Sequence, residues 1–233
     1  YLSKMQKAVQ KYHLSLPDKQ LACAPINSPE GLEYYQAMCC AANFAWANRQ
    51  YITYWIREIF ENVFRMTADQ IGLNLVYDVA HNIAKKEMHR FAGKEMQLCV
   101  HRKGATRAFP PDHPDLPAKY QQAGQPVLVP GDMGRYSYCL AGKKEAMENT
   151  FGSACHGAGR ILSRGAAKKE TEGRNISAEL KEKNILVKAR NRNTLREEFP
   201  AAYKDVSEVV KVIEVSNICE KVARMRPLGV IKG

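Results

Sequence analysis

The sequence predicts an α+β fold, in which small mixed sheets are flanked by helices. Apolar residues repeat every three or four positions over 1–12, 29–64 and 206–215, as they do on one face of a helix. Between these segments, short apolar runs bounded by Gly, Pro or Asn are typical of strands. The 233 residues contain no internal repeat and no long linker, so we expect residues 1–233 to form one domain or part of one.

The helices are predicted from periodicity and from their start signals. Ser28-Pro29-Glu30 supplies a capping hydroxyl, a proline at the first helical position and an acidic residue. The apolar residues from Leu32 to Phe64 then predict one long helix or two broken ones, packed in the core. The chain begins inside a helical pattern, which suggests a fragment, and a further helix is expected at 176–183.

The strands are predicted from short apolar runs. Residues 73–79 and 96–101 are expected to pair as a hairpin around Gly93-Lys94. Further strands are expected at 125–129, 136–140, 185–189 and 225–233. Three Gly-rich turns, at 103–104, 130–134 and 157–159, each follow a strand-like stretch, where loops commonly carry binding residues.

The charge favours a polyanionic partner. The chain holds 35 Lys and Arg against 24 Asp and Glu, which gives a formal charge of +11. Clustered cations of this kind suit nucleic acid, although general solubility is the alternative explanation. The seven cysteines show no C-x-x-C spacing, so we expect reduced thiols that serve mostly as small core residues. No signal segment and no apolar run long enough for a membrane span is present, so we expect a cytoplasmic location without membrane contact.

The candidate chemistry centres on His156, which precedes the turn Gly157-Ala158-Gly159. A helix starting after this turn would place Arg160, Arg164 and Lys168 on one face, and its free N–H groups would favour an anion. The alternative is a loop histidine beside a solvated basic helix. His156 could act as a general base, a metal ligand or a nucleophile toward phosphorus.

A second histidine, His81, follows the predicted strand at 73–79. Imidazole is the commonest metal ligand in proteins, but a lone buried histidine bonded to a backbone carbonyl is the simpler interpretation. The sequence has no Walker A motif and no strand-linked G-x-G-x-x-G.

Long motifs in this order resemble the RtcB family, the GTP-dependent RNA ligases that join 3′-phosphate or 2′,3′-cyclic phosphate ends to 5′-hydroxyl ends. The resemblance extends over the whole chain. It is carried by Tyr77-Asp-Val-Ala-His-Asn82, His101-Arg-Lys-Gly-Ala-Thr-Arg-Ala-Phe-Pro-Pro111, Gly124-Gln-Pro-Val-Leu128, His156-Gly-Ala-Gly-Arg160 and the terminal Val-Ile-Lys-Gly233.

The resemblance implies an RtcB-like fold and a mechanism of tRNA splicing or RNA repair through a GMP–His156 intermediate. It implies GTP and manganese, with two ions in a complete site, and His81 as a metal ligand. RNA (tRNA halves or broken RNA) and an archease-type activator are the implied partners. Arg102, Arg160 and Arg164 are expected to contact phosphate or RNA. The expected GTP-binding residues are His81, Asn82, Pro130, Gly131, Asp132, Met133, Ser137, His156, Gly157, Ala158, Gly159, Tyr203 and Lys232.

This chain departs from the family pattern in two ways. Asp132 and Arg135 stand where the family usually has small residues, and a carboxylate repels a triphosphate unless Arg135 or a metal pairs with it. The family's other metal ligands lie N-terminal to every motif here, so we expect the C-terminal half of a ligase, with a missing N-terminal half as a partner. The alternative is a catalytically inactive RNA-binding or regulatory module on the ligase scaffold.

Overall fold

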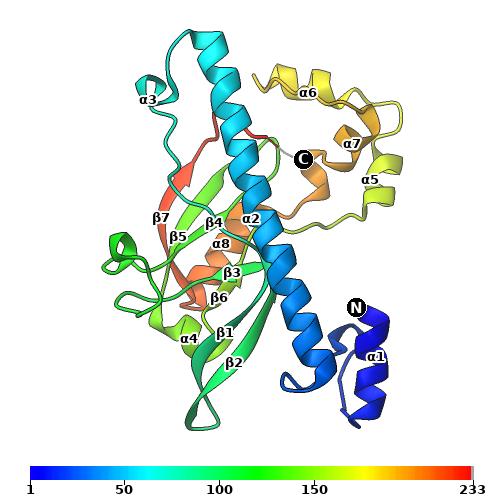
Figure 1. Ribbon diagram of the computed structural model, residues 1–233. Helices are drawn as coiled ribbons and strands as arrows, with labels where there is room; N and C mark the ends of the chain where they lie inside the picture. Colours follow the sequence, from blue (N-terminus) through cyan, green and yellow to red (C-terminus); the bar gives the residue numbers. More distant parts are fainter. Residues whose placement is uncertain (232–233) are drawn as a thin grey trace. The chain divides into compact units, whose positions relative to one another are not determined.

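The computed structural model describes residues 1–231, apart from the side chain of residue 192, and its helices and small sheets confirm the α+β class (Figure 1). The chain divides into two compact units. The first comprises Tyr1–Asp78, Ile83–Met88 and Gln97–His101, and the second comprises Val79–Asn82, His89–Met96 and Arg102–Gly233. None of the described helices is apolar enough over a sufficient length to cross a membrane.

The first unit is built around one long helix, α2 (Pro29–Phe64). Its start is the predicted one, because the Ser28 hydroxyl accepts a hydrogen bond from the Gly31 N–H at 3.1 Å. The helix ends at Arg65, which adopts a left-handed conformation. The shorter helices α1 (Leu2–Lys11) and α3 (Ala68–Ile71) flank it, with a 3-10 turn η1 (Lys19–Leu21). Between α1 and α2, Lys11 pairs with Glu30 at 2.7 Å.

The expectation that α2 belongs to the core is wrong for the described structure. Gly31 is its only buried residue, and Phe44, Trp46 and Val63 are 75%, 56% and 69% exposed. Phe44 and Trp46 are two positions apart and therefore project toward nearly opposite sides of a helix that turns every 3.6 residues. Apolar periodicity predicted the helix correctly, but burial also requires a packing partner for each apolar side.

The strand predicted at 73–79 is also wrong, since no part of this described stretch enters a sheet. Its carbonyl and carboxylate groups bond to α2 instead. Arg57 donates to the Leu73 carbonyl at 3.0 Å, and Arg49 pairs with Asp78 at 2.5 Å. Side-chain donors of the helix thus replace part of the strand ladder that the pattern led us to expect.

The hairpin around Gly93 is confirmed, but with another partner strand. Strand β2 (Lys94–Lys103) contains the predicted 96–101 and pairs with β1 (Asn82–Phe91). Ala92 and Gly93 both have positive φ, at 49° and 78°. Two successive residues with positive φ form the tight turn whose twist matches a two-residue hairpin.

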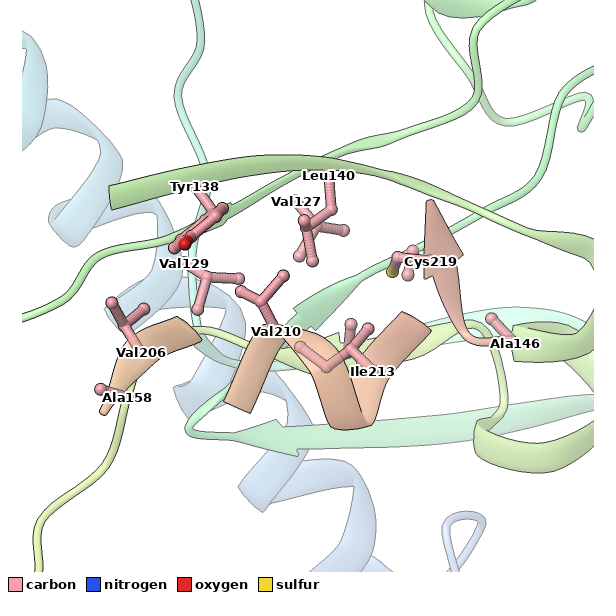
Figure 2. Close-up of a cluster of buried hydrophobic side chains, with 12 residues drawn as sticks. Val127, Val129, Tyr138, Leu140, Ala146, Ala158, Val206, Val210, Ile213 and Cys219 are labelled. Carbon is pink, nitrogen blue, oxygen red and sulfur yellow. The ribbon is translucent and has the colours of Figure 1, made fainter. Parts of the chain in front are cut away.

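The second unit holds a three-stranded antiparallel sheet in the order β4-β5-β7, formed by Pro126–Val129, Ser137–Gly142 and Cys219–Met225. Burial alternates along β4 and β5, as a half-buried strand requires. Helix α8 (Val206–Val215) forms where the sequence predicts a helix. It packs Val206, Val210 and Ile213 against Val127 and Leu140 (Figure 2). The predicted strand at 225–233 is wrong where the structure describes it, because β7 ends at Met225 and residues 226–231 have no regular structure.

A second hydrophobic cluster lies among the short helices of residues 164–202. The predicted helix at 176–183 is confirmed as α6 (Ile176–Glu182). Ile185 and Val187 pack against this cluster, yet no strand forms over the described residues 185–189, so that prediction is wrong. The remaining elements are β3 (Ala105–Arg107), β6 (Ser153–Cys155), α4 (Lys144–Thr150), α5 (Arg164–Glu170), α7 (Arg192–Glu197), η2 (Ala118–Tyr120) and η3 (Pro200–Ala202).

The cysteines are all free thiols, in line with the expectation of reduced cysteines. Their expected place in the core holds for Cys219, which is buried, and in part for Cys155, which packs against the same hydrophobic cluster. Cys23 and Cys40 are exposed. Cysteine spacing that fits neither a metal site nor a disulfide framework argues against these two uses. It carries no information on which cysteines are buried.

Candidate functional site around His156

His156 and His81 are brought together by one glycine. The Gly104 N–H donates to the His81 carbonyl at 2.8 Å and to the Asn82 side-chain oxygen at 3.2 Å. The Gly104 carbonyl in turn accepts from the His156 N–H at 3.4 Å. Gly104 has φ +72°, and a Cβ there would lie 3.5 Å from the His156 ring. Glycine therefore suits this position both in backbone conformation and in space.

The two imidazole rings stack face to face, with centroids 4.2 Å apart and planes 5° apart. Burial lowers the pKa of His156, and the proximity of His81 and Lys103 lowers it further. Because the ordinary pKa of histidine is about 6.5, a lowered value leaves His156 neutral near pH 7. A neutral imidazole has a free nitrogen lone pair, which all three roles considered for His156 require.

The turn at 130–134 lies against the loop that follows His156. Ala158 donates its N–H to the Pro130 carbonyl at 3.2 Å. An added Cβ on Gly131 would lie 2.4 Å from the Tyr136 carbonyl oxygen, so only glycine fits there without a shift. Ser137, half-buried, begins β5 directly after this turn. The three glycine-containing turns, which are far apart in sequence, thus converge on one site.

Asp132 is paired within this turn. Its side chain is fully buried, and its Oδ1 accepts from the Gly134 N–H at 2.8 Å. Its Oδ2 lies 3.1 Å from Nη1 of Arg135, a charge contact whose angles fall outside those of a hydrogen bond. Arg135 also donates to the Lys204 carbonyl at 3.1 Å. The charge of the Asp132 carboxylate is therefore balanced by Arg135, the condition under which it could remain in a turn that the sequence predicts to bind phosphate.

The segment behind Gly159 forms a short antiparallel bridge, and the helix predicted to start there is wrong. Lys204 donates its N–H to the Gly159 carbonyl at 3.0 Å, and Ile161 donates to the Ala202 carbonyl at 2.9 Å. Helix α5 begins only at Arg164, capped by the Ser163 hydroxyl. Backbone pairing with a segment about forty residues later replaces the expected first helical turn.

The guanidinium group of Arg160 forms its contacts within the protein. Its Nη1 donates to the Tyr203 hydroxyl at 2.9 Å and pairs with Glu198 at 3.2 Å. Its Nε and Nη2 donate to the carbonyls of Leu162 and Glu197 at 3.0 and 2.6 Å. The guanidinium also lies 4.8 Å from the centre of the Tyr203 ring. Burial, and then the hydrogen bond to Glu198, raises the pKa of Tyr203, so its hydroxyl stays protonated.

The other cations expected at the site also face internal partners. Arg164 and Lys168 both pair with Glu197, at 3.6 and 2.5 Å. Arg102 is 3% exposed and donates to the Ser153 hydroxyl at 2.9 Å and to the Phe151 carbonyl at 3.0 Å. This placement favours a structural role for Arg102, which holds the loop between α4 and β6.

The remaining predicted residues lie near this arrangement, with one exception. Met133 and Tyr203 pack against the second hydrophobic cluster. Lys232 lies outside the described residues. Sequence reasoning missed Glu197, Glu198 and Lys204. The adjacent acids Glu197-Glu198, placed within a strongly basic stretch, were the signal that could have revealed the ion pairs.

The described residues of this chain supply only part of a metal site. The described residues contain no group of three or more His, Cys, Asp or Glu placed to hold an ion. His81 offers one imidazole beside His156. Because zinc and manganese sites take three or more protein ligands or substrate oxygens, His81 fits a metal as a single ligand and not as a site.

Comparison with known proteins agrees with these motifs. The family model described as "RtcB: tRNA-splicing ligase RtcB" matches residues 1–233. The chain is 54% identical over 233 residues to curated proteins named tRNA-splicing ligase RtcB from Methanococcus maripaludis and Archaeoglobus fulgidus. In both comparisons the match covers 100% of this chain and 48% of the relative. A similarly named protein from Methanocaldococcus jannaschii is also 54% identical, with 24% of its length covered.

The chain thus spans about half the length, or less, of the curated relatives it matches. The family model, by contrast, matches this chain from its first residue to its last, and it includes the two stacked histidines and all three glycine turns. The chain therefore belongs to the RtcB family of tRNA-splicing ligases.

Proposed function

We propose that this chain carries the nucleophile and most of the nucleotide-binding turns of an RNA ligase. The ligase would join RNA 3′-phosphate or 2′,3′-cyclic phosphate ends to 5′-hydroxyl ends, using GTP. The observation that carries the proposal is His156, a histidine with a lowered pKa, stacked on His81 among three glycine turns. Membership of the RtcB family supports the same reading.

The first step of the proposed reaction is guanylation of His156. Its neutral ring nitrogen attacks the α-phosphorus of GTP, a P–N bond forms, and the bond to the bridging oxygen breaks. Pyrophosphate leaves with the electron pair, and the proton on the other ring nitrogen passes to solvent or to a neighbouring acceptor. Backbone N–H groups of the turns at 130–134 and 157–159 would hold phosphate oxygens, since glycine turns allow N–H groups to converge.

In the next two steps, an oxygen of the RNA 3′-phosphate attacks the phosphorus of GMP, and the P–N bond breaks to regenerate His156. The 5′-hydroxyl then attacks the activated 3′-phosphorus, its proton passes to solvent, and GMP leaves. A 2′,3′-cyclic phosphate end would first be opened by water to the 3′-phosphate. In this proposal Asn82, Ser137 and Tyr203 contact the nucleotide, and Asp132 shapes the turn while Arg135 neutralises it.

The family resemblance implies manganese, which would polarise the phosphoryl groups. The residue of this chain that would hold it is His81, and the remaining ligands would come from elsewhere, for example from the rest of a longer protein. Since the relatives are at least twice as long as the match, the complete activity is proposed for a protein that includes such a partner segment. An archease-type activator is a further proposed partner.

The test is the intact mass of the protein after incubation with GTP and manganese. The incubation is run alone and with the complementary part of a relative such as the Methanococcus maripaludis protein. We expect a GMP adduct that requires the complementary part and disappears in His156→Ala. A His81→Ala variant should also lose the adduct, whereas His13→Ala, an exposed histidine of the other compact unit, should keep it.

The second candidate function is an inactive RNA-binding module, which is favoured by the lack of a three-ligand group among the described residues. If no adduct forms under any condition while RNA binding persists in His156→Ala, the ligase proposal is wrong and the binding module replaces it.

A further inference from the structure

The positive charge of the chain is concentrated in one stretch. Residues 160–196 hold eleven of the 35 lysines and arginines but only four of the 24 acidic residues. That excess of seven charges compares with +11 for the whole chain. Such local clustering is the electrostatic footprint of a surface that meets a polyanion.

Many of these cations already have partners. Arg160, Arg164 and Lys168 face the Glu197-Glu198 pair. Arg174 forms a two-pronged pair with Glu179, with bonds of 2.9 and 2.7 Å. The guanidinium of Arg196 bonds to the Thr171 hydroxyl and to the Lys168 carbonyl. Apart from Arg164, whose side chain is 74% exposed and only 3.6 Å from Glu197, these groups stabilise the cluster of short helices and already use donors within it.

Lys169 and four further cations of the same stretch are different, and we name the four that lie within residues 181–190 the strap cations: Lys181, Lys183, Lys188 and Arg190. All four are exposed. None of them makes an ion pair within 4.0 Å to any residue that the structure describes. The pKa of Glu179 is lowered mainly by its hydrogen bond from Arg174, and the charge of Lys183 adds only a small further effect. Unpaired, exposed cations can neutralise phosphates without first breaking an internal bond.

The segment between the strap cations Lys183 and Lys188 is anchored to the protein. Ile185 and Val187 are half-buried against the second hydrophobic cluster, while Leu186 between them is 85% exposed. This alternation anchors residues 185–187 to the protein and turns the intervening side chain to solvent. Met133 and Tyr203 pack against the same cluster, so the strap cations and the proposed nucleotide turn share one support.

We propose that the strap cations bind the phosphate backbone of a single-stranded RNA end that is presented to the His156 site. The inference rests on the proposed function for the identity of the polyanion. It moves the main RNA contact away from Arg102 and Arg160, whose donors are engaged within the chain. The exposed Leu186 would contribute an apolar contact to an unstacked base.

The test compares two variants that lose the same charge. The strap variant replaces Lys181, Lys183, Lys188 and Arg190 with Gln. The dispersed variant replaces Lys19, Lys94, Lys144 and Lys211 with Gln, four exposed lysines spread over the chain. Binding of a fluorescent single-stranded RNA of twenty nucleotides is measured over a salt series, without GTP. Circular dichroism and urea unfolding check that both variants fold.

We expect the strap variant to bind RNA about tenfold or more weakly at low salt. The slope of log K against log salt should fall by about 2 to 3, because each single-strand phosphate contact contributes about 0.7. The dispersed variant should change affinity by less than about twofold. Equal effects of the two variants, an unchanged slope, or binding to an acidic peptide in preference to RNA would each overturn the proposal.

The failure of this inference can be distinguished from the failure of the proposed function. If the strap cations act only on RNA, the GMP adduct on His156 forms equally in the strap variant and in the unmodified protein. Loss of the adduct in the strap variant, with RNA binding unchanged, would place these residues in the nucleotide site and refute the strap proposal.

Discussion

Arg160 and Glu198 form the internal ion pair that connects the loop after His156 to Tyr203, and their coupling can be measured. The side chains of Arg160 and Glu198 are 24% and 22% exposed, so the pair lies between a surface and a buried salt bridge. Surface pairs contribute about 0.2 to 1 kcal/mol, and hydrogen bonds to charged groups about 1.5 to 3 kcal/mol. Scaled for partial exposure, we expect a coupling energy of about 1 to 2 kcal/mol.

The perturbation is a double-mutant cycle with Arg160→Met and Glu198→Gln. Methionine keeps an unbranched apolar stem but removes all donors to Tyr203, Glu198 and two carbonyls. We expect Arg160→Met alone to cost about 2 to 4 kcal/mol, because it also removes the cation that lies 3.2 Å from the Glu198 carboxylate. Glu198→Gln should cost less, since the amide oxygen can still accept a hydrogen bond.

The assay is urea unfolding of the four proteins of the cycle, with the free energy of unfolding extrapolated to water. Arg164→Met is the matched control, because Arg164 has a 74% exposed side chain and a longer, 3.6 Å contact to Glu197. It should destabilise the protein far less than Arg160→Met. A coupling energy below about 0.5 kcal/mol, or equal losses for the two arginine variants, would refute the positioning role of Arg160.

Three further predictions follow from glycine geometry, core packing and protonation. Gly131→Ala should destabilise the protein by about 2 kcal/mol or more, because the added Cβ would lie 2.4 Å from the Tyr136 carbonyl oxygen. Gly165→Ala, where the added Cβ meets open space in α5, should instead stabilise the protein by about 0.5 kcal/mol. Thermal unfolding measures both. Val210→Ala, at 1% exposure, should cost about 1 to 3 kcal/mol in urea unfolding, and Val212→Ala, at 65% exposure on the same helix, much less; equal losses would contradict the packing of α8. The lowered pKa of His156 means that the unfolded chain binds a proton more readily than the folded protein. The contribution of His156 to stability is therefore present above about pH 6.5 and is lost as the pH falls through the folded pKa. The free energy of unfolding is measured over a pH series for the unmodified protein and for His156→Gln. The same dependence on pH in both proteins would contradict the prediction.

The sequence predicted those parts of the fold whose signals are local. The Ser28-Pro29 start of α2, the helix at 206–215 and the strands predicted at 125–129 and 136–140, which form at 126–129 and 137–142, all depend on patterns or capping within a few residues. The strand predicted at 73–79 failed because an extended pattern does not specify a partner. In the described structure, Arg49 and Arg57 of α2 bond to this segment.

The same limit applied to the candidate site. The sequence singled out His156 and the glycine turns, because glycine and histidine have recognisable chemistry wherever they occur. It did not show that Gly104 bonds to the carbonyl of His81 or that the two rings stack. It also placed Arg160 on a helix, whereas backbone pairing with residues 202–204 holds it in a bridge.

By itself, the sequence determined the α+β class, the family and the excess of positive charge, and it singled out His156 and His81 as candidates for the chemistry. Only the tertiary structure decided which cations remain available. Arg160 meets Tyr203 from 43 residues away, and Arg102 meets Ser153 from 51 residues away. Contacts over such separations depend on how the whole chain folds back on itself. For that reason a charge pattern can predict a polyanionic partner, but only the folded chain separates the cations that hold the protein together from those that face solvent.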